Sequence, residues 1–125
     1  MYGGAPDPPT CTMVHVSSTL SPYTLSSSDK PGTLISAVVL NSNNYIEWVK
    51  EMRNALHAKR NTCFIDETIS RPADDSPDLN NWRTVNSMII GWIRTSIDSK
   101  VKSTVTNFTS AHQLWLDLKQ VLIGK

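Results

Sequence analysis

Residues 44–59, which read NYIEWVKEMRNALHAK, decide how the rest of the chain can fold. Their apolar side chains recur at spacings of three, one, three, three and one, which is one face of a 3.6-residue period. The residues of this face are Tyr45, Trp48, Val49, Met52, Ala55 and Leu56. Asn44, with Glu47 three residues later, is typical of a capping-box start, and the cations Lys59 and Arg60 suit a helix end. We therefore predict an amphipathic helix that begins at Asn43 or Asn44 and ends near residues 59–60.

Two further helices are predicted downstream. One begins between residues 79 and 81 and extends to about residue 97, and the other occupies about residues 110–122, with Ser110 and Gln113 as a second capping-box candidate. Gly91 lies inside the first of these and costs a helix about 1 kcal/mol relative to Ala, so we expect it to mark a close helix–helix approach. We expect a short helix within residues 98–106 and a non-helical insert at residues 63–69, followed by a loop because Pro72 and Pro77 disfavour helix.

The N-terminal part of the chain has a different composition. Residues 1–30 are rich in Ser, Pro and Thr, show no apolar period, and are predicted to form a disordered leader. Pro31 and Gly32 mark the boundary. Residues 33–40 are predicted to be extended, as a short strand or an apolar arm against the bundle, because the run is short and its β-branched content disfavours a free helix. The predicted fold is all-α: a small bundle of three to five helices in residues 31–125, with this arm and the leader before it.

Four tryptophans lie on the predicted apolar faces. The predicted core anchors are Trp48, Trp82, Trp92, Trp115, Tyr45, Met52, Leu56 and Leu118. An alternative is that some tryptophans form an exposed platform on which single-stranded nucleic acid stacks. That platform requires Lys or Arg between the aromatic residues, whereas aliphatic residues flank these tryptophans at helical spacing, so the pattern favours the core.

The charged residues indicate two surface segments of opposite sign. The formal net charge of +1 is far less basic than is typical of a nucleic-acid reader. The basic segment contains Lys50, Arg53, Lys59 and Arg60, and the acidic segment contains Asp74, Asp75 and Asp78. Both can be simple solvated surfaces. The functional alternatives are an interface in which the acidic segment of one copy meets the basic end of the first helix in another, and a weak, nonspecific RNA contact.

Catalytic and ligand-binding motifs are not recognisable in the sequence. Cys63 lies six residues from His57, a spacing that does not bring them together on one helix, and neither has an orienting third group. Cys63 is therefore interpreted as a small, partly buried thiol, and His57 and His112 as polar helix-end residues. The cysteines and histidines have no metal-ligand spacing, and phosphate-binding glycine loops are absent. We predict no enzyme activity, no cofactor, no metal, no small-molecule substrate, no membrane span and a cytoplasmic location.

The order of these elements resembles the N-terminal, capsid-like region of the Gag polyprotein of plant copia-type LTR retrotransposons. Three groups of residues carry the resemblance over about residues 30–125: Asn44-Tyr45-x-x-Trp48 with Met52-Arg53-x-Ala55-Leu56; Trp82-x-x-x-Asn86-x-Met88-Ile89-x-x-Trp92; and Ala111-x-x-Leu114-Trp115-x-x-Leu118.

The resemblance implies a non-catalytic helical domain that associates with copies of itself into a shell around RNA. The family's zinc knuckle, the usual RNA-capturing element, is absent from this sequence. Residues 119–125 depart from the family's pattern, so we expect the domain to be truncated at its C-terminus. Two other hypotheses are an RNA-binding accessory domain, which would use the basic end of the first helix, and a small enzyme, which would use Cys63.

Overall fold

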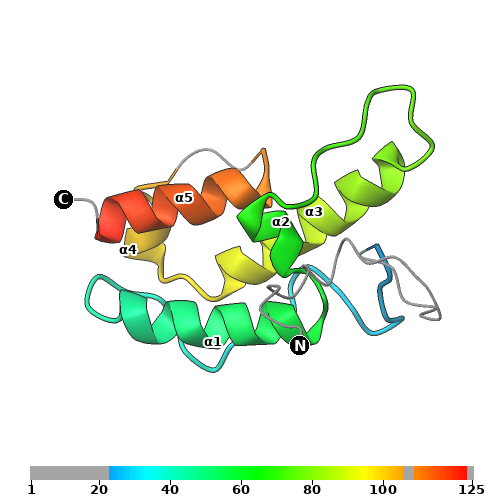
Figure 1. Cartoon of the computed structure of the whole chain (residues 1–125). Helices are drawn as coiled ribbons and strands as arrows, with labels where there is room; N and C mark the ends of the chain where they lie inside the picture. Colours follow the sequence, from blue (N-terminus) through cyan, green and yellow to red (C-terminus); the bar gives the residue numbers. More distant parts are fainter. Residues whose placement is uncertain (1–22, 106–108, 124–125) are drawn as a thin grey trace, which may run out of the picture.

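The computed structural model describes residues 23–105 and 109–123, which form a bundle of helices with one long loop. The helices are α1 (Tyr45–Ala58), α2 (Thr62–Asp66), α3 (Leu79–Thr95), α4 (Ser99–Lys102) and α5 (Ala111–Leu122). In Figure 1, α5 lies above α1, and α3 runs from between them toward the right, where the loop of residues 67–78 projects. Within the described residues there is no strand, so the predicted all-α class is confirmed.

The core lies between α1, α3 and α5, and α2 packs against both α1 and α5. The fully buried side chains of the core come from each of the three long helices. Trp48, Met52 and Leu56 of α1 are completely inaccessible, as the α1 period predicted. Burial of such apolar surface is the main favourable term in folding, so the spacing of residues 44–59 determines which face of α1 points inward.

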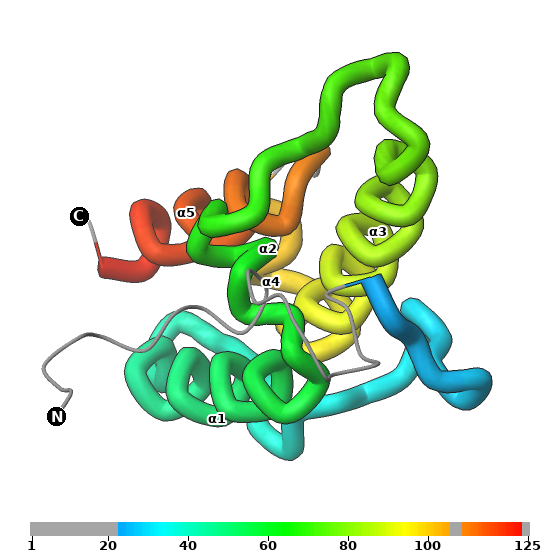
Figure 2. The backbone as a smooth tube through the Cα atoms, turned by 45° about the vertical axis from the view of Figure 1, so that its right-hand side comes forward, coloured from blue at the N-terminus to red at the C-terminus, as the bar shows by residue number. Residues whose placement is uncertain are grey.

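The arm of residues 33–40 is not helical, and its last residue pairs with the chain just after α3. Leu40 forms an isolated parallel bridge with Ile97, in which the Leu40 amide donates to the Ser96 carbonyl at 2.7 Å and the Asp98 amide donates to the Leu40 carbonyl at 2.9 Å. At the start of the arm, the Thr95 hydroxyl of α3 donates to the Thr33 carbonyl at 3.3 Å, and Figures 1 and 2 show the chain before the arm near α3. The extended arm is therefore attached at both ends to the region around α3.

Residues 62–66 form a helical turn, whereas the sequence predicted a non-helical insert there. The prediction was wrong because Cys63, Phe64 and Ile65 are all buried in succession. A short run of apolar residues has no period, so a strand, a loop and a buried helical turn give the same pattern. The turn ends at Glu67, which has the left-handed φ of 59° that closes many helices.

The two predicted capping boxes have different outcomes. The Ser110 hydroxyl accepts from the Gln113 amide at 3.0 Å, so the predicted N-cap of α5 forms. The Asn44 side chain makes no cap hydrogen bond and instead accepts from the Asn41 amide and donates to the Val39 carbonyl. Asn44 therefore holds the turn that precedes α1, which competes with its role as a cap.

Candidate interaction surface

The predicted anchors lie in the interior or at its edge. Exposed fractions are 0% for Trp48 and Trp92, 7% for Trp115 and 9% for Trp82. Met52, Leu56 and Leu118 are fully buried, and Tyr45 is half-buried beside Trp48, with ring centroids 6.3 Å apart. A base can stack only on an exposed ring face, so these burial values exclude a stacking platform built from the four tryptophans.

The indole N–H groups distinguish the tryptophans from one another. Trp48 Nε1 donates to the buried Ser96 hydroxyl at 3.1 Å, and Trp92 Nε1 donates to the Lys30 carbonyl at 2.8 Å. Trp82 Nε1 is buried and finds no acceptor among the described residues. A buried polar group without a partner costs about 1–3 kcal/mol, so we expect the indole nitrogen to contribute stability at Trp48 but not at Trp82.

Residues 23–30, which the sequence assigned to the disordered leader, make specific contacts with the helices; residues 1–22 of that leader lie outside the described residues. The Asp29 carboxylate pairs with Lys59 Nζ at 2.7 Å, and the same ammonium lies 4.6 Å from the centroid of the Trp92 ring. Burial alone would raise the pKa of Asp29, but hydrogen bonds from Lys59 and from the Ser26 amide outweigh it and lower that pKa. Residues 23–30 therefore pack on the helices, although the sequence assigned them to the disordered leader.

The close approach at Gly91 involves this N-terminal segment and not a second helix. A Cβ atom at Gly91 would lie 2.5 Å from Pro31 Cβ and 2.7 Å from the Pro31 carbonyl oxygen. The prediction of a helix–helix contact there was therefore wrong, although the inference that the glycine permits a close approach was right. We call residues 23–35 the strap, since they cross the last turns of α3.

Arg53 and Lys59, both predicted as basic contact residues, are engaged inside the molecule. Arg53 makes two hydrogen bonds to the Asp66 carboxylate, at 2.8 and 3.1 Å, and its guanidinium lies 5.7 Å from the Trp115 ring centroid. The hydrogen bonds with Asp66 raise the pKa of Arg53. Lys59 holds the strap, as described above. Lys50 and Arg60 are exposed, so the predicted basic segment is not one uniform solvent-facing surface.

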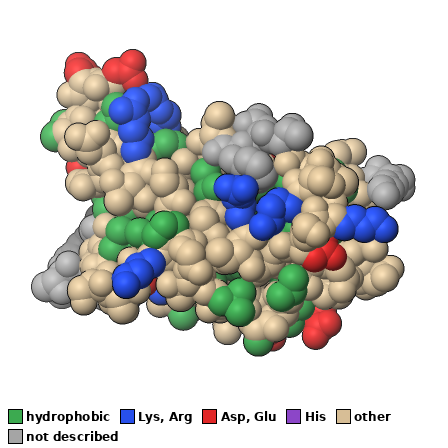
Figure 3. Space-filling view, turned by 180° about the vertical axis from the view of Figure 1, so that it is seen from behind, with side chains coloured by type: hydrophobic (Ala, Val, Ile, Leu, Met, Phe, Trp, Pro, Cys, Tyr) green, Lys and Arg blue, Asp and Glu red, His purple; other side chains and the backbone are tan. Residues whose placement is uncertain are grey.

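The acidic segment lies on the projecting loop. Asp74, Asp75 and Asp78 are all exposed, and Asp74 pairs with Arg71 at 3.0 Å. Figure 3 shows the Lys and Arg side chains of one face in separate groups rather than in a continuous patch. A continuous basic stripe is the electrostatic feature typical of a nucleic-acid surface.

Asn86, which the sequence analysis named only as part of the family resemblance, has a structural role. It is buried on α3, where its side chain donates to the Thr109 carbonyl at 3.1 Å and accepts from the Ala111 amide at 2.8 Å. These bonds fix the start of α5 on α3. Its position inside an otherwise apolar stripe was the available signal, because a buried amide is stable only when its hydrogen bonds are satisfied.

The residues considered for catalysis are not assembled into a site. Cys63 is buried and disulfide-bonded, so the expected thiol is not present; the chain's other cysteine, Cys11, lies outside the described residues. His57 is exposed, whereas the His112 ring is half-buried, with Nδ1 2.7 Å from the Ile65 carbonyl oxygen. No group of three metal-ligating side chains occurs in the described part of the chain, and no helix there is long and apolar enough to cross a membrane.

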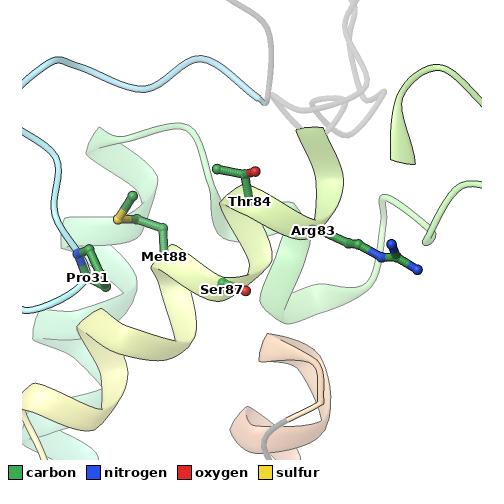
Figure 4. Close-up of a pocket in the computed structure, with 5 residues that line it drawn as sticks. All are labelled: Pro31, Arg83, Thr84, Ser87 and Met88. Carbon is green, nitrogen blue, oxygen red and sulfur yellow. The ribbon is translucent and has the colours of Figure 1, made fainter. Parts of the chain in front are cut away.

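Two shallow hollows have apolar linings. One lies between the strap and α3, where Figure 4 shows Pro31 beside Met88 and Arg83 extending away from them. The other lies where α1 begins and α5 ends, and is lined by Tyr45, Ile46, Leu122 and Ile123 together with polar residues of the preceding turn. Ile46 is 57% exposed and Ile123 is 47% exposed. We call Ile46, Leu122 and Ile123 the apolar edge.

A comparison with protein families identifies part of the chain. The family model described as the Gag-polypeptide of LTR copia-type matches residues 26–73. These residues are similar to copia-type Gag, and we call them the Gag segment. The predicted resemblance to copia-type Gag is confirmed here, and the plant origin stays a prediction. No curated protein and no solved structure matches the chain.

The Gag segment contains most of the strap, the arm, α1 and α2, and ends within the projecting loop. It therefore includes Asp29, Pro31 and Lys59, the residues that hold the strap, whereas the partners of the strap on α3 lie beyond it. Copia-type Gag is a structural component of a polyprotein, so the match supports a structural, Gag-like role for the segment.

Proposed function

We propose that this chain is a non-catalytic structural module of a copia-type Gag and that it acts by associating with copies of itself. The observation that carries the proposal is the Gag match over residues 26–73, a segment that packs with α3, α4 and α5 around one tryptophan-rich core. A rigid helical unit of this kind suits repeated assembly, because association then orders few side chains.

The ion pairs within the chain limit which charged side chains are available for a contact between copies. A contact between the acidic loop of one copy and the basic end of α1 in another was the expected arrangement. Arg53 and Lys59 already have carboxylate partners within the chain, at 2.8 and 2.7 Å. A new partner would have to replace an existing one, so these two cations add little net attraction between copies.

The RNA-binding alternative gains no specific support from the same geometry. Neutralising several phosphates requires several available cations on one face, and the two best-placed candidates are occupied. RNA binding is therefore the alternative that the following experiment distinguishes from self-association.

The test is light scattering coupled to size-exclusion chromatography on the complete chain, after nuclease treatment and again with added RNA. Self-association predicts that the mass rises with protein concentration in the nuclease-treated sample. A monomer that forms larger species only with RNA, and releases it steeply as salt rises, would instead support the RNA-binding alternative.

A further inference from the structure

We infer that two copies of this chain associate by exchanging their straps, so that the strap of each copy packs on α3 of the other. This inference rests on the proposed function, because it names the element through which self-association occurs. In Figures 1 and 2 the strap, drawn in blue, lies on the outside of the helices beside α3. Residues 36–39 connect the strap to Leu40, which pairs with Ile97.

The strap is held by groups that are 30 to 62 positions away in sequence. The polar interactions are Asp29 with Lys59 at 2.7 Å, the Lys30 carbonyl with Trp92 Nε1 at 2.8 Å, and the Thr33 carbonyl with the Thr95 hydroxyl at 3.3 Å. These interactions depend on where the strap lies and not on which chain supplies it. A strap from a second copy can therefore make the same contacts, as in domain-swapped dimers.

The site on α3 is fitted to this particular segment. Pro31 lies so close to Gly91 that a Cβ atom there would be 2.5 Å from Pro31 Cβ. The Asp29 side chain is only 10% exposed, and its partner Lys59 is fixed over the ring of Trp92. A segment that docks there must supply a carboxylate and, two residues later, a chain that fits against a glycine. Every copy of this chain carries such a segment, so the second copy is the partner that the site favours.

The connection between the strap and the bundle is a short bend. The Ser36 hydroxyl accepts from the Val38 amide at 3.1 Å and donates to the Val38 carbonyl at 3.0 Å. When this bend opens, the four residues 36–39 span at most about 14 Å, so the strap reaches only a bundle that lies directly beside its own. The exchange therefore predicts a close dimer in which the two connections run next to each other.

The free energy of exchange depends on these connections. The strap makes the same contacts in the single chain and in the exchanged dimer, so those contacts do not favour either state. Leu34 is 56% exposed and Val39 is 44% exposed, and they flank the bend on its two sides. In a two-fold dimer the paired connections bury part of this apolar surface, which offsets the loss of translational freedom.

Charge reversal at the Asp29–Lys59 pair tests the exchange. Asp29→Lys and Lys59→Asp each place like charges in contact, both in the single chain and in a dimer of that variant with itself. In an exchanged heterodimer of the two variants, the introduced lysine meets the introduced aspartate at one site, and the native Asp29 and Lys59 meet at the other. The mixture is therefore expected to associate about tenfold or more tightly than either variant alone and than the parent chain.

Sedimentation velocity on the complete, nuclease-treated chains measures this association, and circular dichroism checks that each variant is folded. Native mass spectrometry, with one variant labelled with ¹⁵N, identifies dimers that contain one chain of each kind. The control is a chain that carries both reversals, since it restores the ion pair within itself. Mixed with the parent chain, it would place like charges at both sites of an exchanged heterodimer, so no heterodimer is expected.

A second comparison locates the contact at α3. Gly91→Ala, added to the Lys59→Asp chain, is expected to weaken the heterodimer by about tenfold, because the new Cβ would meet Pro31 of the incoming strap. Gly32→Ala in the same chain is the matched control, since a Cβ at Gly32 would meet nothing within 4 Å. A heterodimer that is insensitive to Gly91→Ala would show that the opposite charges meet elsewhere, and would overturn the exchange.

The outcomes separate the exchange from the proposed function. If the parent chain associates but the two charge variants form no heterodimer, the straps are not exchanged, although self-association stands. If the parent chain is monomeric at every concentration, both proposals fail, whatever the mixture does. Heterodimers between the parent chain and the doubly reversed chain, as abundant as those of the charge variants, would also overturn the exchange.

Discussion

Replacing Gly91 by alanine tests how the strap is held. In an open helix the change would stabilise the chain by about 1 kcal/mol, since alanine is the better helix former. Here the new Cβ would lie 2.5 Å from Pro31 Cβ and 2.7 Å from the Pro31 carbonyl oxygen. Carbon atoms pack at roughly 3.5–4.0 Å, so the strap must move outward by about 1 Å or more.

The strap cannot make that movement freely. Lys30, the neighbour of Pro31, accepts the Trp92 indole hydrogen bond at 2.8 Å, and Asp29 is paired with Lys59. Overpacking costs about 1–3 kcal/mol, and loss of the indole hydrogen bond adds about 1 kcal/mol. Set against the helix gain, Gly91→Ala is expected to lower the free energy of unfolding by about 1–3 kcal/mol.

Urea denaturation followed by circular dichroism measures this change, and hydrogen exchange locates it. Faster exchange is expected in residues 23–35, with little change in α5. Gly32→Ala is the matched control, because a Cβ at Gly32 would meet nothing within 4 Å and its φ is not positive. A Gly91→Ala variant that is more stable than the parent, with unaltered exchange in the strap, would refute the close approach.

Three other predictions concern the core and the strap. Trp48→Phe is expected to destabilise the chain by about 1 kcal/mol more than Trp82→Phe, because only Trp48 has an acceptor for its indole N–H; equal losses in denaturant titrations would argue against this difference. Asn86→Ala is expected to cost about 1–3 kcal/mol, since it leaves a buried amide at the start of α5 unpaired, and unchanged thermal unfolding would contradict it. The lowered pKa of Asp29 means that its ion pair stabilises the folded state above the ordinary value of 3.8 and is lost as pH falls through the lowered pKa. Asp29→Asn should therefore make strap exchange fast already at neutral pH and less dependent on acid, and an identical pH profile in parent and variant would count against the ion pair.

The long helices could be predicted from the sequence because each buries a periodic face. The face of α1, Tyr45 to Leu56, is defined by spacing alone, and the Ser110 cap of α5 is a local interaction between residues three apart. α2 could not be predicted in the same way, because three successive buried residues carry no period.

The strap and the basic segment show the limit of pattern-based prediction. The composition of residues 23–30 resembles a disordered tail, and their order depends on Lys59 and Trp92, which are remote in sequence. Likewise, the positive charges of Arg53 and Lys59 could be seen in the sequence. Their ion-pair partners, Asp66 and Asp29, could not be predicted, because tertiary packing brings them together. The apolar edge was also not predicted, because Ile46 lies outside the apolar period of α1 and reads as a single surface residue.

Sedimentation of the complete, nuclease-treated chain over about a hundredfold range of concentration tests the central claim most directly, since association equilibria respond to concentration by mass action. A self-associating Gag module predicts an average mass that rises with concentration from the 13.9 kDa of the single chain. A mass that stays at 13.9 kDa throughout, with the chain folded, would contradict the account.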